Sequence, residues 1–439
     1  MARPLNSAVE TAEVIDLAQD GRGIARREGK AVFIEGALPG ESVSYRVFKR
    51  RAQFDEAVLV QVLQASPQRV EPTCVHFGLC GGCALQHLAP VAQLQAKQAQ
   101  LLETLHRIGG VRPQQVLEPI HGPVWGYRRR ARLGVKYVHK KQRVLAGFRE
   151  RLSPYLADLQ SCEVLTPALR RLPALLAELV GTLQLREQIP QVEVAVGDDQ
   201  TALVFRVLAE PSAEDLARLG QFGEQLNVQI YLQTGGPASV RPLAPPALPL
   251  RYRVSDGGVS IEFKPTDFIQ VNAAVNSAMV DQALCQLQVQ PTDAVLELFC
   301  GLGNFTLPLA RRCASVVGVE GDADLIDRAT RNAAQNQVEN VEFLVQNLFE
   351  PASFGAWDSR RFDRVLLDPP RAGAQEVMER MSRWGPKRVV YISCHPGSLA
   401  RDARILTQAQ GFELIAAGVM DMFAHTTHVE SIAVFERHP

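Results

Sequence analysis

The sequence predicts an α/β protein with three parts: a small N-terminal β-barrel, a mostly β central domain, and a C-terminal domain built on a doubly wound parallel sheet. Two observations predict this class. From about residue 261 onward, short β-branched runs alternate with helical patterns, as in repeated β-α-β units. Between residues 6 and 65, short β-rich runs alternate with turn residues, as in small barrels. A chain of 439 residues, 46% of them hydrophobic, is long enough to give two or three domains their own cores.

The N-terminal runs also contain a motif. The letters GRGIAR at residues 21–26 and LPGE at residues 38–41 resemble the TRAM domain, an OB-like barrel that binds RNA. This resemblance covers only the first part of the chain. It implies that residues 6–65 form an RNA-binding barrel.

The central domain is expected over residues 70–260. Pro90 opens an amphipathic helix over 91–108, which we expect to pack on the catalytic domain. The rest reads mostly as strands, with a Leu-rich helical stretch at 167–183 and a Pro-rich loop at 235–250. The apolar face predicted for the first helix consists of Val91, Leu94, Leu101, Leu102, Leu105 and Ile108.

Composition indicates the compartment more clearly than the partner. The N-terminus lacks a basic start followed by an apolar core, and no stretch approaches the roughly 18 apolar residues of a membrane span. The sequence therefore predicts a cytoplasmic protein without a membrane partner. The 47 basic residues balance 47 acidic ones, so net charge excludes no partner. In a reducing compartment the eight cysteines are expected to serve metal binding, catalysis or burial rather than disulfides.

Four of these cysteines form a candidate metal site. Cys74, Cys80 and Cys83 are clustered, and Cys162 lies far along the chain. Four thiolates suffice for a closed four-ligand site, but the second Cys-x-x-Cys pair typical of zinc is missing. Three clustered cysteines and one remote cysteine suit an iron-sulfur cubane as well or better. The alternative is a set of free thiols, reactive or buried.

A nucleoside cofactor is predicted at the tips of the C-terminal strands. The strand at 294–298 runs into a glycine turn, and Glu320 ends the next strand, where a carboxylate can accept hydrogen bonds from ribose hydroxyls. Thr306 stands where a dinucleotide fingerprint has its third glycine, so S-adenosylmethionine fits better. Asn347 and Asp368 follow at the next strand tips. The sequence thus predicts a Rossmann-like methyltransferase domain over 261–439. The alternative is that these carboxylates only cap helices.

Cys394 directly follows the buried strand at 389–392 and is the candidate nucleophile. A helix expected to open at 396–398, with Ser398 as N-cap, would favour its thiolate. Glu430, at the entrance to the final strand, is the candidate proton acceptor. The alternatives are plain burial of the thiol and a strand-capping role for the glutamate.

The acceptor atom is expected to be carbon. In amino-group methylases an aromatic residue follows Asp-Pro-Pro and stacks on the target, whereas here Arg371 follows Asp368-Pro-Pro. Carbon 5 of a pyrimidine is too weak a nucleophile until a thiolate attacks carbon 6. After methyl transfer, the intermediate must lose its carbon-5 proton to a base before the cysteine leaves.

A basic stretch favours RNA as the partner. Residues 128–151 hold ten Lys or Arg against one acid, Glu150, and Tyr127, Tyr137 and Phe148 are interleaved for stacking on bases. The target base must leave its stack to reach a buried thiol, so a single-stranded loop is the expected substrate. The alternative is a solvated charged face. The basic residues are Arg128, Arg129, Arg130, Arg132, Lys136, Lys140, Lys141, Arg143, Arg149 and Arg151.

Five motifs together resemble the RNA uracil-5-methyltransferase family across essentially the whole chain. They are FIQVN at 268–272, LFCGLGN at 298–304, LDPPRAG at 367–373, ISCHP at 392–396 and HVES at 428–431. The resemblance implies methylation of uridine carbon 5, with Cys394 as nucleophile and Glu430 as proton acceptor. The residues that it implies around S-adenosylmethionine and the target base are Gln270, Phe299, Asn304, Glu320, Asn347 and Asp368.

The barrel and the cysteines together most resemble the iron-sulfur-containing 23S ribosomal RNA branch of that family. This resemblance implies a [4Fe-4S] cluster on the four cysteines and 23S ribosomal RNA as substrate, with no obligate protein partner. Two alternatives stay open: methylation at another ribosomal or transfer RNA site, and a non-catalytic RNA-binding or ribosome assembly factor.

Overall fold

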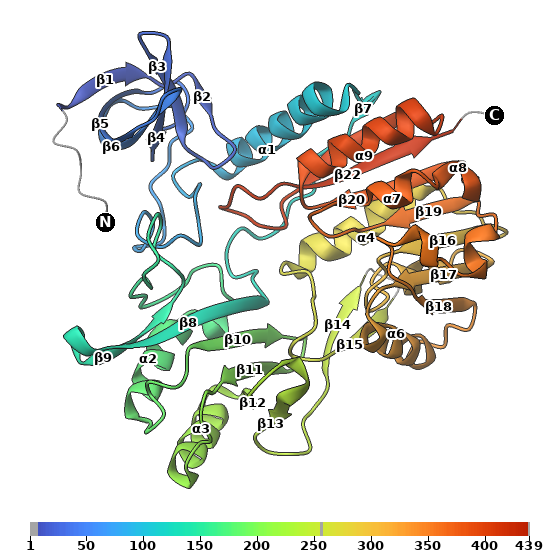
Figure 1. Ribbon diagram of the computed structural model, residues 1–439. Helices are drawn as coiled ribbons and strands as arrows, with labels where there is room; N and C mark the ends of the chain where they lie inside the picture. Colours follow the sequence, from blue (N-terminus) through green and yellow to red (C-terminus); the bar gives the residue numbers. More distant parts are fainter. Residues whose placement is uncertain (1–7, 255–257, 438–439) are drawn as a thin grey trace.

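A computed structural model describes residues 8–254 and 258–437, which form three sheets with their helices and one separate hairpin (Figure 1). The predicted fold class is confirmed: an N-terminal β-sheet unit and a central sheet accompany a C-terminal α/β domain. Among the described residues, no helix combines the length and apolarity needed to cross a membrane.

The N-terminal unit is a six-stranded sheet in the order β1-β5-β6-β4-β3-β2. Register shifts between β5 and β6 bend these long strands. Alternating apolar residues such as Val32, Ile34 and Val43 point to one small core. The strands are β1 (Glu10–Glu13), β2 (Asp16–Leu17), β3 (Gly23–Arg27), β4 (Lys30–Glu35), β5 (Ser42–Arg50) and β6 (Phe54–Gln64).

The central unit is a six-stranded sheet in the order β13-β12-β11-β10-β8-β9. It carries helix α2 (Leu172–Thr182) and also α3 (Ala213–Leu226), which the strand-rich reading of the sequence missed. Local signals for α3 exist, because Ser212 caps its start by accepting from the Asp215 N–H. The strands are β8 (Arg130–Val138), β9 (Arg143–Gly147), β10 (Gln191–Val196), β11 (Thr201–Arg206), β12 (Gln229–Gln233) and β13 (Val240–Pro242).

The C-terminal sheet has eight strands in the order β18-β17-β16-β19-β20-β22-β21-β7. The predicted parallel arrangement holds from β18 to β20, but β22 runs antiparallel to both β20 and β21. A hairpin of β21 and β22 thus completes the sheet beside the predicted nucleophile. The strands are β16 (Ala294–Leu298), β17 (Ser315–Glu320), β18 (Val341–Val345), β19 (Arg364–Leu367), β20 (Arg388–Ser393), β21 (Glu413–Met420), β22 (Glu430–Glu436) and β7 (Gln115–Val116).

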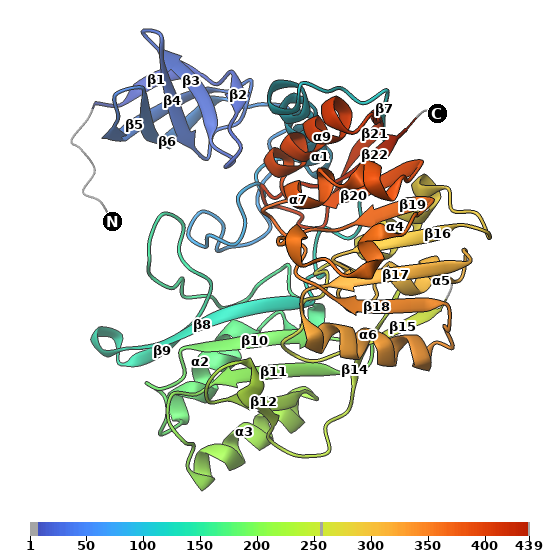
Figure 2. The same cartoon turned by 45° about the vertical axis from the view of Figure 1, so that its right-hand side comes forward.

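Helices cover both faces of this sheet (Figures 1 and 2). Its strands are therefore continuous apolar runs, and all six residues of β20 are buried. The helices are α4 (Ala273–Leu287), α5 (Thr306–Ala310), α6 (Ala323–Gln335), α7 (Gln375–Met378), α8 (Met381–Trp384) and α9 (Pro396–Ala409).

A separate hairpin of β14 (Leu250–Val254) and β15 (Val259–Phe263) spans the expected boundary at residue 260. Two side chains bind its backbone: the Asn332 Oδ1 of α6 accepts from the Glu262 N–H, and the Oδ1 of Asn336, the C-cap residue of α6, accepts from the Ser260 N–H. The hairpin thus packs on the C-terminal domain.

Helix α1 (Pro90–Thr104) continues into one π-helical turn (Leu105–Gly109) and contacts β21 and α9 (Figure 1). The predicted apolar face is partly wrong, since Val91 and Ile108 are 69% and 51% exposed. Its buried face instead includes polar residues, Gln93 at 1% and Lys97 at 2% exposure, beside the apolar Leu101 and Leu105. The partners of Gln93 and Lys97 include polar groups of the loop between β21 and β22.

Candidate active site and cysteine pocket

Strand register brings the predicted catalytic residues to one edge of the C-terminal sheet. Ser393 of β20 pairs with Ser431 of β22, so the adjoining residues Cys394 and Glu430 face each other where the two strands end. Leu367 of β19 pairs with Tyr391 of β20, which places Asp368 at the same edge. The sheet therefore presents a thiol and two carboxyls together.

The electrostatics of this edge follow from burial. Burial, together with the nearby Asp368 carboxylate, raises the pKa of Glu430 to about 8, although the Lys97 ammonium opposes the rise. Burial likewise raises the pKa of Asp368 to about 7. Both carboxyls are thus poised to exchange protons near neutral pH.

The expected depression of the thiol's pKa is wrong. Burial, together with the charges of Glu430 and Asp368, raises the pKa of Cys394 to about 11. Helix α9 does begin at Pro396, but its N-cap is His395, whose Nδ1 accepts from the Ser398 N–H at 3.2 Å. Ser398 is therefore not the cap, and the two acids outweigh the helix terminus.

The glycine turn after β16 is held by Glu320, the residue predicted to bind the ribose. Glu320 accepts from the Gly301 N–H at 3.1 Å and from the Gly321 N–H at 2.7 Å. Phe299, which leads into this turn, has a left-handed backbone with φ 62°, uncommon for a bulky residue. Glu320 thus supports the turn through backbone contacts, whereas the cap of the following helix α6 is Asp322 and not Glu320. Glu320 lies at the strand tip where a ligand would bind.

The other predicted cofactor residues border the same region. Asn304 and Asn276 exchange reciprocal amide hydrogen bonds of 3.0 and 3.1 Å, and the Tyr252 hydroxyl also donates to Asn304. Asn347 is exposed just after β18, where its Oδ1 accepts from the Phe349 N–H. Gln270 is half-buried just before α4.

Sequence reasoning overlooked Glu297, in the middle of β16. This side chain is 1% exposed, and its Oε2 has no hydrogen-bond partner among the described residues. Burial, together with the charges of Asp368 and Glu320, raises its pKa to about 8. The signal was a carboxylate inside an otherwise apolar strand.

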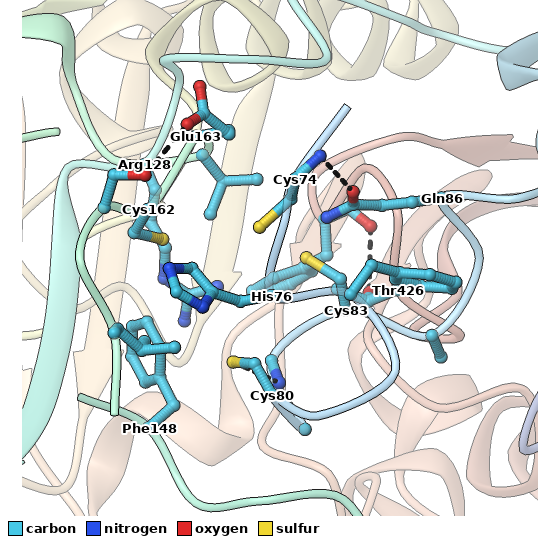
Figure 3. A pocket seen from close by; sticks show the side chains of 18 of the residues that line it. Cys74, His76, Cys80, Cys83, Gln86, Arg128, Phe148, Cys162, Glu163 and Thr426 are labelled. Carbon is cyan, nitrogen blue, oxygen red and sulfur yellow. Dashed lines mark hydrogen bonds between the residues drawn. The ribbon is translucent and has the colours of Figure 1, made fainter. Parts of the chain in front are cut away.

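The four predicted metal-binding cysteines line one cavity of about 310 Å³ (Figure 3). Cys74, Cys80 and Cys83 come from the segment before α1, and Cys162 comes from the segment before α2; their sulfur atoms point into the same space. Among the described residues, no three Cys, His, Asp or Glu side chains are close enough to ligate a single metal ion. The structure thus brings the four thiols to the wall of one cavity.

The cysteine cavity and the predicted catalytic edge share a wall. Phe423, Thr426, Thr427 and His428, which line the cavity, belong to the loop that joins β21 to β22. That loop ends at Glu430. The two predicted sites are therefore neighbours in space.

The basic stretch is less available than its sequence suggests. Arg129 pairs with Asp198, Arg132 pairs with Glu193, and further ion pairs engage Arg130, Arg143 and Arg151. The cations that are exposed outside these ion pairs are Lys136, Lys140, Lys141 and Arg149. Three of them lie at or near the end of the β8–β9 hairpin, which extends away from the C-terminal sheet (Figure 2).

The expected aromatic stacking also changes. Tyr127 is 5% exposed and its hydroxyl donates to the Ala424 carbonyl at 3.0 Å, so it cannot stack on a base. Phe148 lines the cysteine cavity. Tyr137 is half-buried between the His139 and Arg186 side chains.

Known proteins resemble this chain over nearly its whole length. Residues 90–438 match the tRNA (Uracil-5-)-methyltransferase family, and residues 7–60 match the TRAM domain. A 23S rRNA (uracil(1939)-C(5))-methyltransferase RlmD from Methylococcus capsulatus is 50% identical over 436 residues, which cover 99% of this chain and 98% of that protein. The protein of the same name from Alkalilimnicola ehrlichii is 49% identical over 97% of this chain and 96% of its own.

A solved structure shows the same fold. The Pyrococcus abyssi tRNA (uracil-54, C5)-methyltransferase, in complex with S-adenosyl-L-homocysteine, superposes with a TM-score of 0.73 at 24% identity, over 97% of this chain and 100% of that one. Together with the match over residues 90–438, the relatives at about 50% identity settle the family. The chain belongs to the tRNA (uracil-5-)-methyltransferase family.

Proposed function

We propose that this protein transfers a methyl group from S-adenosylmethionine to carbon 5 of a uridine in 23S ribosomal RNA, at the position equivalent to uracil 1939. The observation that carries the reaction type is the strand register that sets Cys394 opposite Glu430 beside Asp368. The relatives at about 50% identity, with that substrate in their names, support the choice of RNA.

The proposed reaction uses the thiol and the carboxyl in turn. The Cys394 thiol gives up its proton to solvent, its Sγ bonds to carbon 6 of the uracil, and the electrons of the carbon 5–carbon 6 double bond move towards the carbon 4 carbonyl to give an enolate. S-adenosylmethionine supplies the electrophilic methyl group when bound. Glu430 then removes the proton from carbon 5, the double bond re-forms, and the carbon 6–sulfur bond breaks to release the thiolate.

The residues proposed to hold S-adenosylmethionine and the target base are those at the strand tips. Glu320 would accept from ribose hydroxyls, and Phe299 would offer a ring face near the Asn347 amide. Asp368 would lie between this site and the thiol. The proposed set is Gln270, Phe299, Asn304, Glu320, Asn347 and Asp368.

RNA is proposed to bind across the face that joins the central sheet to the catalytic domain. A cleft of about 1360 Å³ lies there, and Phe268, two residues before Gln270, lines it with its side chain 73% exposed. An exposed ring at such a place suits stacking on an unpaired base. Exposed lysines near the β8–β9 tip would meet phosphates.

The test uses purified protein, labelled S-adenosylmethionine and 23S ribosomal RNA from a strain that lacks the enzyme. Methyl incorporation should map to 5-methyluridine at the single proposed uridine, and transfer RNA should remain unlabelled. Labelling of transfer RNA or of another ribosomal site would instead favour the alternative substrates. RNA binding without incorporation would favour the assembly-factor alternative.

We further propose that Cys74, Cys80, Cys83 and Cys162 hold a [4Fe-4S] cluster. The support is the donor set, because four thiols line one cavity and four cysteines are the usual ligands of such a cluster. The cluster would tie the segment of Cys74 to the remote segment of Cys162, and it would thereby stabilise the fold.

The cluster proposal predicts that anaerobically purified protein contains about four iron and four sulfide per chain. Replacing Cys80 with alanine (C80A) should remove most of the iron and lower the unfolding temperature. Replacing Cys285, an exposed cysteine on α4, provides the matched control and should leave iron content unchanged. Stoichiometric zinc without iron would refute the proposal.

The raised pKa values predict a pH dependence of activity. Glu430 accepts a proton only when ionised, and its pKa of about 8 keeps it mostly protonated at pH 6.5. The Cys394 thiol, with a pKa of about 11, also ionises more readily as pH rises. We therefore expect kcat/KM to increase roughly tenfold or more between pH 6.5 and 9. A profile that is flat or falls over this range would contradict the assignment.

A further inference from the structure

The loop over residues 421–429 determines where Glu430 stands. Met420, the last residue of β21, pairs with Glu430, the first residue of β22, so this pair closes the loop. Cys394 lies outside the loop, at the end of β20. A displacement of the loop would therefore move the proton acceptor more than the nucleophile.

His425 is the point at which other parts of the chain hold this loop. Its N–H donates to the Gln93 Oε1 at 3.0 Å, and its carbonyl accepts from the Ala84 and Leu85 N–H groups at 2.8 and 3.0 Å. Its ring stacks on Trp125 with 3.9 Å between centroids. Its backbone is left-handed, with φ 64°, a conformation that only surrounding contacts maintain in such a residue.

Helix α1 supplies the polar half of this support from two residues one turn apart. The Gln93 amide, 1% exposed, also donates to the Leu85 and Leu88 carbonyls at 2.9 and 2.7 Å. The Lys97 Nζ, 2% exposed as a residue, lies 2.7 Å from the Asp421 Oδ1 and 3.1 Å from the Phe423 carbonyl. Burying an amide and an ion pair costs free energy. Such buried polar groups are expected to hold the 421–429 loop in a single geometry.

We propose that Gln93 and Lys97 are positioning residues that act through the 421–429 loop to hold Glu430 in place for removal of the carbon-5 proton. This inference rests on the proposed function. It adds that α1, which lies outside the C-terminal sheet, governs one chemical step and not the others. Attack by Cys394 and methyl transfer should survive when this support is removed.

The test separates these steps with two RNA substrates. With 5-fluorouridine at the target, no proton can be removed, so formation of the covalent complex reports attack and methyl transfer alone. Replacing Gln93 with leucine (Q93L) should leave this rate at the wild-type value. With natural uridine, the same variant should turn over about 10- to 100-fold more slowly and should accumulate covalent protein–RNA complex that survives denaturation.

Gln98 provides the matched control on the same helix. Its side chain binds the Val419 N–H of β21 and the Leu117 carbonyl, not the loop. Replacing Gln98 with leucine (Q98L) should leave the fraction of covalent complex unchanged. A purely structural role for Gln93 would lower the amount of active enzyme in both assays and leave that fraction unchanged as well.

A second variant covers the case in which Q93L does not fold. Replacing Gln93 with glutamate (Q93E) keeps an acceptor for the His425 N–H and removes both amide donors, and it should show the same accumulation. Folded variants that turn over slowly without accumulating complex would overturn the inference alone. A wild-type protein that forms no complex with 5-fluorouridine RNA would overturn the proposed function and the inference with it.

Discussion

Replacing Cys394 with serine (C394S) is expected to abolish methylation, with a fall in rate of at least about 10⁴-fold. A hydroxyl is a far weaker nucleophile than a thiolate, and without the bond to carbon 6 the uracil carbon 5 cannot take the methyl group. The measurement is incorporation of labelled methyl groups into 23S ribosomal RNA, together with trapping on 5-fluorouridine RNA. Both signals should disappear.

Binding of S-adenosylmethionine should be retained in C394S, because the strand tips proposed to bind it belong mainly to β16, β17 and β18. Cys313 offers a control, since it is a buried cysteine in the same domain whose Sγ donates to the backbone carbonyls of Leu309 and Ser315. The corresponding C313S variant should keep its activity. Residual methylation by C394S above a few per cent of the wild-type rate would show that the reaction does not depend on a covalent adduct.

The sheet edge that holds the proposed catalytic residues could be predicted from sequence because strands have a local sequence pattern. Each predicted catalytic residue directly adjoins a run of β-branched or apolar residues, and parallel strands end at a common edge. The antiparallel register of β20 and β22 then brings Cys394 and Glu430, which are 36 positions apart in the sequence, opposite each other. What remained hidden was their charge state, since burial raises all three pKa values and neighbouring acids further contribute to those of Cys394 and Glu430.

The support of the catalytic edge could not be predicted in the same way. Gln93 and Lys97 look like solvent-facing residues of an amphipathic helix, because polar side chains are rarely buried without partners. Their partners, His425 and Asp421, lie more than 300 positions away in the sequence. Only the fold shows that Gln93 and Lys97 meet polar groups of the 421–429 loop, while Leu101 and Leu105 of the same helix enter the apolar core.

The ion pairs that engage part of the basic stretch were hidden for a related reason. A run of Arg and Lys predicts an exposed basic surface, because the sequence does not show which acids from other segments lie beside it in the fold. Asp198 and Glu193 lie on or next to strand β10, a neighbour of β8 in the sheet, and Glu35 comes from the N-terminal barrel. Several arginines are therefore occupied by acids within the central unit, Arg151 ties that unit to the N-terminal barrel, and the exposed lysines gather near the β8–β9 tip.

Replacing Glu430 with glutamine (E430Q) should produce a different defect from that of C394S. Attack and methyl transfer need only the thiol and the bound cofactor, whereas the amide cannot accept the carbon-5 proton. We expect turnover to fall by about 10²- to 10⁴-fold while covalent protein–RNA complex builds up on natural uridine. Denaturing electrophoresis of labelled RNA measures that complex directly. Loss of turnover without any complex would assign Glu430 to an earlier step.

Stability can show that the E430Q defect is chemical rather than a failure to fold. A carboxyl whose pKa rises from 4.5 to about 8 on folding stabilises the native state below pH 4.5 relative to higher pH, and this contribution is lost as pH rises through 8. Glutamine does not ionise, so it has no such loss of stability at high pH. The free energy of unfolding of E430Q minus that of wild type should therefore be larger at pH 9 than at pH 5 by on the order of 2–4 kcal/mol. Glu413→Gln, at the exposed far end of β21, should show no comparable gain. If E430Q is more stable than wild type at alkaline pH and yet has lost turnover, the variant has kept its fold. The loss of turnover then comes from the missing carboxylate, and the free energy spent on burying Glu430 serves the reaction rather than stability.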